Sequence, residues 1–183
     1  MYGELLQLFP RSLQIFCDFY WWFQSVPWVY FLHSESDVFN VFKIFLAYVE
    51  TQFSTCIKIL WSDSGGEYMS SGFQKYLQTK GIISQRTCLY TPQQNGVAER
   101  KNRHLLDVTR SLLLESSVPT HFWVEALATA AHLINRLLST SLQNQSPYYR
   151  LFQTSPSYDH FSDLFVLCTC LLLRPLNLLN VCF

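Results

Sequence analysis

Apolar residues recur at helical spacing over residues 37–53. They stand three or four positions apart, so a helix with about 3.6 residues per turn carries them all on one face. Residues 34–37, Ser-Glu-Ser-Asp, have the order of a capping box, which starts helices. The pattern therefore predicts an amphipathic helix whose apolar face covers a sheet. The apolar positions are Val38, Val41, Phe42, Phe45 and Val49.

Continuous apolar runs predict the strands of that sheet. Residues 13–22 and 28–32 are apolar at nearly every position and are separated by Pro27, which predicts two neighbouring strands buried on both faces. The apolar run at residues 57–61 predicts a third buried strand. Residues 82–87 predict a fourth.

Three further helices are predicted among and after these strands. A short one over residues 71–80 ends at Gly81, a second begins near Val97, and a third spans residues 120–138. Residues 139–147 form a polar connection. Strands that alternate with helices predict an α/β fold, a sheet flanked by helices. The predicted buried positions of the last two helices are Ala98, Leu105, Val108 and Leu112, followed by Phe122, Ala126, Ala130, Leu133 and Leu137.

Length, charge and cysteine content exclude several classes of protein. The 183 residues suffice for one hydrophobic core, and the formal net charge of zero means that any nucleic-acid contact must come from a local basic patch. The six cysteines include no CxxC pair, which excludes the usual zinc and disulfide frameworks and favours a reduced, intracellular setting. No signal-peptide pattern is present, and the apolar run at residues 164–173 is shorter than the roughly 20 residues of a membrane span. A secreted protein or a membrane partner is not expected.

Two carboxylates, Asp63 and Glu99, have thirty-five residues between them, and each stands in a short, distinctive sequence motif. Asp63 follows the strand predicted at residues 57–61, and α/β sheets bind ligands beyond the carboxyl ends of their strands. Glu99 is expected in the first turn of the helix that begins near Val97, after a polar loop at residues 92–96, where the helix dipole favours an ionised carboxylate. Two such groups suit Mg²⁺ or Mn²⁺, which take oxygen ligands and hold phosphates.

The segments WSDSGGEY and YTPQQNGVAERKNRHLL resemble the catalytic core of integrases from copia-type long-terminal-repeat retrotransposons. The resemblance extends from about Trp28 to about Pro156 and includes the phrases WVYFL, VETQF, FWVEAL and LINRL. It implies an RNase H-like mixed sheet with flanking helices, and metal-dependent cleavage and joining of DNA by an Asp, Asp, Glu triad with Mg²⁺ or Mn²⁺. Asp63 matches the second Asp of the triad, and Glu99 matches the Glu. The implied partners are the retrotransposon ends, the target DNA and further copies of the chain, in the nucleus.

Polar and basic residues around Glu99 are the candidate DNA contacts. Arg100, Lys101 and Arg103 follow Glu99 on the predicted helix, where cations beside a metal carboxylate suit phosphates. Gln94 and Asn95 lie in the predicted loop and can bond to bases or backbone. A solvated helix face and an ordinary turn are the alternative interpretations of these two groups.

The sequence departs from the family at both ends. The family's first Asp stands just before the residues that match Met1, which predicts an N-terminally truncated core without that ligand and therefore only background activity. Asp18 is the alternative first carboxylate, but this assignment requires the alignment with the family to shift relative to the WVYFL phrase. Residues 21–25 stand where the family has a segment like Asp-Asp-Phe-Ser-Arg. Residues 1–156 are predicted to form the core-like domain, and residues 157–183 a degenerate or frameshifted tail of unknown fold. A DNA-binding remnant without chemistry and a transposon relic without function remain the alternatives.

Overall fold

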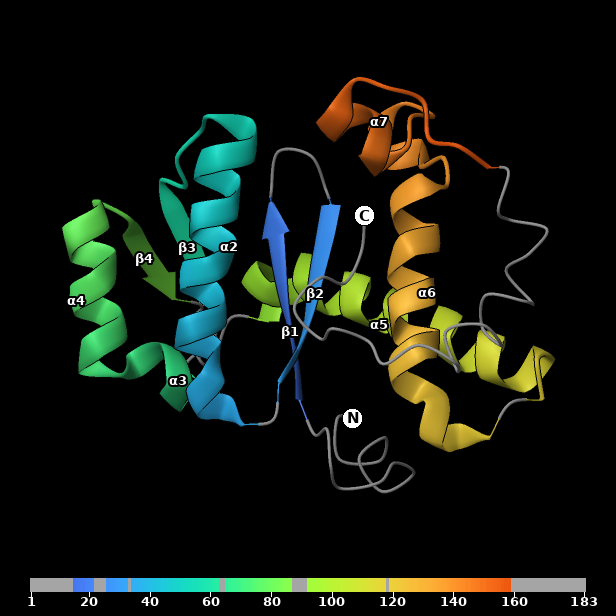
Figure 1. Ribbon diagram of the computed structural model, residues 1–183, viewed down its shortest axis with the longest axis horizontal. Helices are drawn as coiled ribbons and strands as arrows, with labels where there is room; N and C mark the ends of the chain where they lie inside the picture. Colours follow the sequence, from blue (N-terminus) through green and yellow to red (C-terminus); the bar gives the residue numbers. More distant parts are fainter. Residues whose placement is uncertain are drawn as a thin grey trace. The chain divides into compact units, whose positions relative to one another are not determined.

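A computed structural model of the chain shows helices and short strands in two compact units (Figure 1). One unit comprises residues up to Phe31 and from Lys101 onward, and the other comprises Leu32–Arg100. The structure describes the backbone of residues 15–21, 26–32, 34–62, 65–86, 92–117 and 119–158, and the side chains of residues 26–32, 34–62, 65–86, 99–117 and 119–158.

Strands β1 (Ile15–Trp21) and β2 (Val26–Leu32) pair in a two-stranded sheet, which confirms the first two predicted strands. β2 is buried along nearly its whole length, as its continuous apolar run predicted. It begins before the predicted boundary and includes Pro27. A proline is tolerated near the start of a strand, where its missing N–H interrupts little of the ladder. The side chains of β1 lie outside the described residues.

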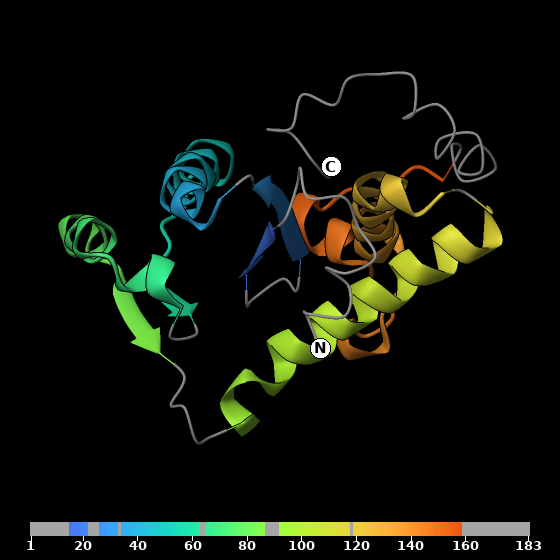
Figure 2. The same cartoon turned by 90° about the horizontal axis from the view of Figure 1, so that it is seen from below.

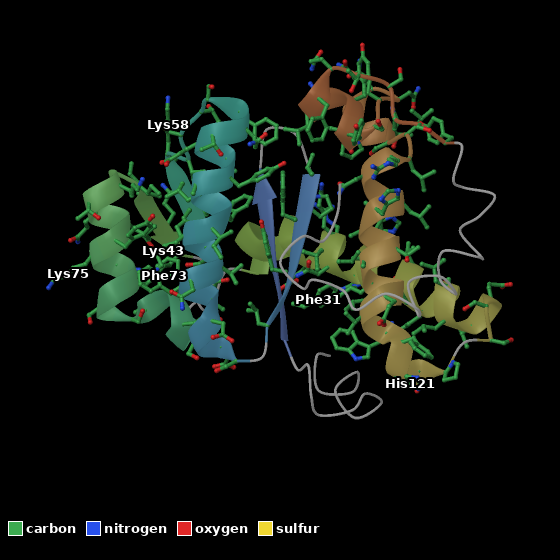
Figure 3. The ribbon with its side chains drawn as sticks, viewed as in Figure 1. Phe31, Lys43, Lys58, Phe73, Lys75 and His121 are labelled. Atoms are coloured by element: carbon green, nitrogen blue, oxygen red, sulfur yellow. The ribbon has the colours of Figure 1, made fainter. Side chains whose placement is uncertain are left out.

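In the same unit, β2 packs against helices α5 (Pro92–Glu115) and α6 (Trp123–Arg136). Phe31 of β2, labelled in Figure 3, meets the Trp123 ring edge-on, with ring centroids 6.2 Å apart. The Asn135 amide donates to the Pro27 carbonyl at 3.2 Å, so a buried hydrogen bond also joins α6 to β2. The buried apolar cluster consists of Val29, Phe31, Leu105, Leu113, Trp123, Val124, Ala126, Leu127, Ala128, Ala130 and Ala131.

The end of α6 and the segment after it differ from the sequence expectation. Leu137, predicted to be buried, lies just beyond α6 and is 53% exposed, because the helix ends one residue before it. The predicted polar connection contains a 3-10 turn, η3 (Thr140–Leu142), and an antiparallel bridge between Ser139 and Gln145. Helix α7 (Pro147–Phe152), which periodicity did not predict, follows and packs on α6. Local polar bonds, including the Ser146 side chain that caps α7, organise this segment without an apolar period.

The second unit begins with the capping box, which the structure confirms. Ser34 and Asp37 cap the 3-10 turn η1 (Glu35–Asp37), and helix α2 (Val38–Phe53) follows directly. All five predicted apolar positions of α2 are buried. Phe42 packs against Phe73, which is fully buried, with ring centroids 5.1 Å apart.

Phe73 belongs to helix α4 (Ser71–Lys80), whose predicted limits are confirmed. Gly81 ends α4 with φ of +68°, the left-handed conformation that glycine adopts without a steric cost. The short helix α3 (Gly66–Met69) precedes α4. An exposed ion pair, Lys80 to Glu50 at 3.2 Å, also links α4 to α2.

Strands β3 (Ile59–Ser62) and β4 (Ile83–Arg86) form a parallel pair, confirming two predicted strands. α2 and α4 lie on the same side of this pair (Figure 2). The prediction that β3 is a buried strand is wrong, because Ile59 and Trp61 are 42% and 55% exposed. Apolar composition cannot reveal whether a sheet is covered on one face or on two.

No helix in the described part of the chain is both long and apolar enough to cross a membrane. Residues 159–183 lie outside the described residues, so the predicted boundary between the core-like domain and the tail stays a prediction.

Candidate nucleic-acid interface

Helix α5 carries most of the candidate site, and it begins at Pro92 instead of near Val97. The predicted polar loop at residues 92–96, with Gln94 and Asn95, is therefore helical in its backbone. Proline suits the first position of a helix, since its N–H would be unpaired there and its φ is already helical. Glutamine is a good helix former, so a segment without an apolar period still extends the helix. The side chains of Gln94 and Asn95 lie outside the described residues.

The earlier start of α5 changes the setting of Glu99. Glu99 lies about two turns inside the helix. The prediction that the helix dipole stabilises its ionised carboxylate is therefore wrong, because that effect fades within the first turn. Its side chain is exposed, and among the described residues it has no hydrogen bond or ion pair. The carboxylate is therefore available to a ligand from solvent.

The residues after Glu99 divide between a buried stripe and an exposed strip of α5. Leu105 and Leu113 are buried, and Thr109 between them is buried with its hydroxyl donating to the Leu105 carbonyl at 2.8 Å. Lys101 stands one turn before Leu105 and is half-buried, and burial lowers the pKa of its amino group. Glu99, Arg103 and Arg110 are exposed, whereas Leu106 and the two predicted buried positions Val108 and Leu112 are partly buried against the apolar cluster.

The three predicted basic DNA contacts therefore differ in accessibility. Arg100 and Arg103 are exposed, while Lys101 continues the buried stripe toward the start of the helix. Arg103 forms no ion pair with any described residue. Arg103 also stands four residues after Glu99, so a carboxylate and a guanidinium are about one helical turn apart on an exposed surface.

Asp63 lies outside the described residues, and its separation from Glu99 stays a prediction. The strand before it is present, since β3 ends at Ser62. Asp18 lies on β1, but its side chain is also outside the described residues. Within the part of the chain whose side chains are described, no group of three His, Cys, Asp or Glu residues is arranged to hold a metal ion.

Sequence reasoning missed the exposed aromatic side chain nearest to Asp63 along the chain. The Trp61 residue is 55% exposed, and its side chain makes no ring contact or hydrogen bond with the described residues. Its apolar neighbours on β3 directed the interpretation toward a buried strand. The alternation of exposed Ile59 and Trp61 with the more buried Leu60 and Ser62 appears only in the structure.

Comparison with known proteins gives the chain a family context. No model of a protein family matches it. It is 39% identical over 168 residues, 91% of its length, to the retrovirus-related Pol polyprotein from transposon RE2 of Arabidopsis thaliana. It is 43% identical over 133 residues, 73% of its length, to the corresponding polyprotein from transposon TNT 1-94 of Nicotiana tabacum. The chain spans only about a tenth of these relatives, 11% and 10% of their lengths.

A solved structure agrees with this relationship. The catalytic core domain of HTLV-2 integrase, determined in complex with magnesium in a trimeric form, matches with a TM-score of 0.53 at 15% sequence identity. The match covers 75% of this chain and 91% of that domain, and it confirms the predicted α/β fold class. The chain is therefore a homologue of the retrovirus-related Pol polyproteins of plant transposons, over a segment that has the fold of a retroviral integrase catalytic core.

Proposed function

We propose that the chain is the DNA-binding and metal-binding segment of a copia-type transposon integrase, which acts on transposon ends and target DNA. The observation that carries the proposal is the exposed strip of α5, defined by Glu99, Arg100 and Arg103, in a chain with the fold of an integrase core. A carboxylate and two guanidinium groups on one accessible helix face combine a metal ligand with phosphate contacts.

Glu99 fits a hard divalent cation, because its carboxylate is exposed and is not held by any described residue. Asp63 is the second proposed ligand, on the strength of its sequence motif. When bound, Mg²⁺ or Mn²⁺ supplies Lewis-acid activation of the attacking water or hydroxyl and stabilises the leaving oxygen. The role of Glu99 in this scheme is to hold the cation beside the DNA that α5 binds.

Arg100 and Arg103 are proposed to contact phosphates, which fixes DNA on the protein without reading its sequence. Lys101 contributes less, because its amino group is half-buried and burial lowers its pKa. Gln94 and Asn95, earlier on α5, are the proposed contacts to bases or sugars. With this function, the expressed protein would act in the nucleus, where its DNA substrates are. It would also assemble with further copies of itself.

Binding of Mn²⁺ and joining of DNA test the proposal on the full chain. We expect Glu99→Gln, which removes the charge of the side chain and keeps its shape, to lose a Mn²⁺-binding site. The number of bound ions is obtained from the electron paramagnetic resonance signal of the Mn²⁺ that remains free in solution. Glu115→Gln, at an exposed position at the end of the same helix, is the matched control and should retain the site. Equal Mn²⁺ binding by the two variants would contradict the assignment of Glu99.

The joining assay uses labelled duplex DNA and a target plasmid in Mg²⁺ or Mn²⁺. Any metal-dependent product should disappear with Asp63→Asn and with Glu99→Gln. Loss of product with Asp18→Asn as well would assign Asp18 of β1 as the third carboxylate. DNA binding without product in any metal would instead favour the second candidate, a DNA-binding segment without chemistry.

A further inference from the structure

Strands β3 and β4, labelled in Figure 1, run parallel, so their carboxyl ends lie at the same edge of the pair. Ser62 and Arg86 are the last register partners at this edge. Asp63, the proposed metal ligand, follows Ser62 directly in the chain. Because α/β sheets bind ligands beyond the carboxyl ends of their strands, Arg86 is a cation at the edge where such a ligand is expected.

Covalent geometry limits the distance between Arg86 and Asp63. Neighbouring strands lie about 4.8 Å apart and consecutive Cα atoms about 3.8 Å apart, so the Cα atoms of these two residues lie within roughly 9 Å of each other. The side chain of arginine is among the longest in proteins. It can therefore reach a group that is bound beside the carboxylate of Asp63.

The guanidinium of Arg86 is accessible. The residue is exposed, and it makes no hydrogen bond or ion pair with the described residues. Two other cations of the same unit are engaged within the protein. The Lys80 ammonium pairs with Glu50 at 3.2 Å. The Lys43 ammonium lies over the Phe39 ring, 4.4 Å from its centroid. Arg86 is instead available to an anion from solvent.

A DNA phosphate fits the pair of Arg86 and Asp63. A guanidinium binds phosphate through two parallel N–H···O bonds, which an ammonium cannot form. In phosphoryl transfer, divalent cations and arginine side chains together neutralise the charge that develops on the phosphate oxygens. A carboxylate that holds a cation and a guanidinium on the neighbouring strand supply both positive charges at one edge of the sheet.

We propose that Arg86 binds the DNA phosphate that lies on the metal ion held by Asp63. The proposal rests on the function proposed above, and it adds a substrate-contacting residue from β4 to the contacts proposed for Arg100 and Arg103. It makes one specific claim beyond that function, namely that Arg86 and Asp63 serve the same phosphate.

Lys58 offers a matched control on the same pair of strands. Its carbonyl accepts a hydrogen bond from the Ile83 N–H at 2.9 Å, so it continues the ladder at the amino end. Lys58 is exposed, has no ion pair with the described residues, and shares a face with Ser62 and Arg86, because side chains alternate along strands. Lys58, labelled in Figure 3, stands about 13 Å along the strand from Ser62, at the edge opposite Asp63.

The salt dependence of DNA binding by the full chain tests the phosphate contact. In Mn²⁺, Arg86→Ala should lower the slope of log K against log salt by about 0.9, the contribution of one phosphate contact on B-form DNA. Lys58→Ala should leave the slope unchanged, and Arg86→Lys, which keeps the charge, should retain most of it. The urea midpoints should equal that of the parent, since both residues are exposed. An unchanged slope in Arg86→Ala, or an equal decrease in Lys58→Ala, would refute the contact.

Methylphosphonate linkages, which remove the charge of a single phosphate, test whether the phosphate is shared. Placed one at a time in the duplex, one linkage should weaken binding by the parent in Mn²⁺ and have no further effect on Arg86→Ala. The same linkage should have no further effect on Asp63→Asn. If the two variants become insensitive at different linkages, the residues serve separate phosphates and the proposal is wrong. Absence of any DNA binding by the parent would instead refute the function proposed above.

Discussion

Replacing Arg103 by alanine separates the electrostatic contribution of α5 to DNA binding from its contribution to folding. Arg103 is exposed and has no ion pair with the described residues, so its removal should leave the buried stripe of Leu105, Thr109 and Leu113 intact. Lys101, two residues earlier, is half-buried, and its pKa is lowered by burial. The two cations are close in sequence but should contribute very differently to phosphate binding.

The magnitude follows from counterion release. Each phosphate contact contributes about 0.9 to the slope of log K against log salt on B-form DNA, so Arg103→Ala should lower that slope by about 0.9. Between 50 and 200 mM salt, the affinity ratio of parent to variant should then fall by about 3.5-fold. Lys101→Ala should change the slope by clearly less. Fluorescence anisotropy with a labelled duplex over a salt series measures all of these slopes.

Lys75→Ala is the control, because Lys75, labelled in Figure 3, is an exposed lysine on α4 and not on the proposed interface helix α5. The slope of log K against log salt for Lys75→Ala should equal that of the parent. The decrease in slope caused by Arg103→Ala should be similar for unrelated DNA sequences, because contacts to phosphates carry little information about the bases. An unchanged slope in Arg103→Ala would make the strip an ordinary solvated face. A loss in Lys101→Ala as large as that in Arg103→Ala would refute the argument from burial.

Four further substitutions test the stability of the protein. Phe73→Ala should lower the free energy of unfolding by about 3–5 kcal/mol in urea titrations, because its fully buried ring is central to the packing of α2 on α4. Gly81→Ala should cost about 1 kcal/mol through its φ of +68°, with no atom near the added methyl group, whereas Gly72→Ala within α4 should stabilise by about 0.4–1 kcal/mol. Lys101→Met should raise the urea midpoint at pH 7, since it removes a desolvated charge. Burial lowers the pKa of Lys101 in the folded state below the value of 10.5 that it has in the unfolded chain. Just below pH 10.5, the unfolded parent therefore binds more protons than the folded parent, and its free energy of unfolding rises with pH. The Lys101→Met variant should lack this rise.

The elements predicted correctly from the sequence are those whose ends carry local chemical signals. The capping box at Ser34 and Asp37 and the positive φ of Gly81 act within a few residues, so sequence alone places the limits of α2 and α4 well. The start of α5 was misplaced, because an apolar period begins only after Gly96, whereas Pro92 already satisfies the requirements of a first helical position. Backbone preference at a helix end does not need an apolar face.

The candidate site was predicted less completely, because accessibility is a tertiary property. A cluster of Arg100, Lys101 and Arg103 looks uniform in sequence, yet the helical period turns Lys101 toward the buried stripe and leaves its neighbours in solvent. The run that ends in Trp61 looks like a buried strand, because composition reports apolar content and not which face is covered. Both differences could be found only once the neighbours of each element were known.

The helical period also gives the strip of α5 a property that isolated motifs lack. Glu99 and Arg103 stand on one continuous helix, so about 6 Å of axial rise separates them whatever contacts the side chains make. A cation held by Glu99 and a phosphate held by Arg103 would therefore keep a fixed spacing along the helix, without a loop that must first become ordered. The Leu105, Thr109 and Leu113 stripe fixes the rotation of the same helix by burying an adjacent side of it. A substitution on the stripe should thus reduce DNA binding only to the extent that it unfolds the protein, while a substitution on the strip should change the salt slope at constant stability.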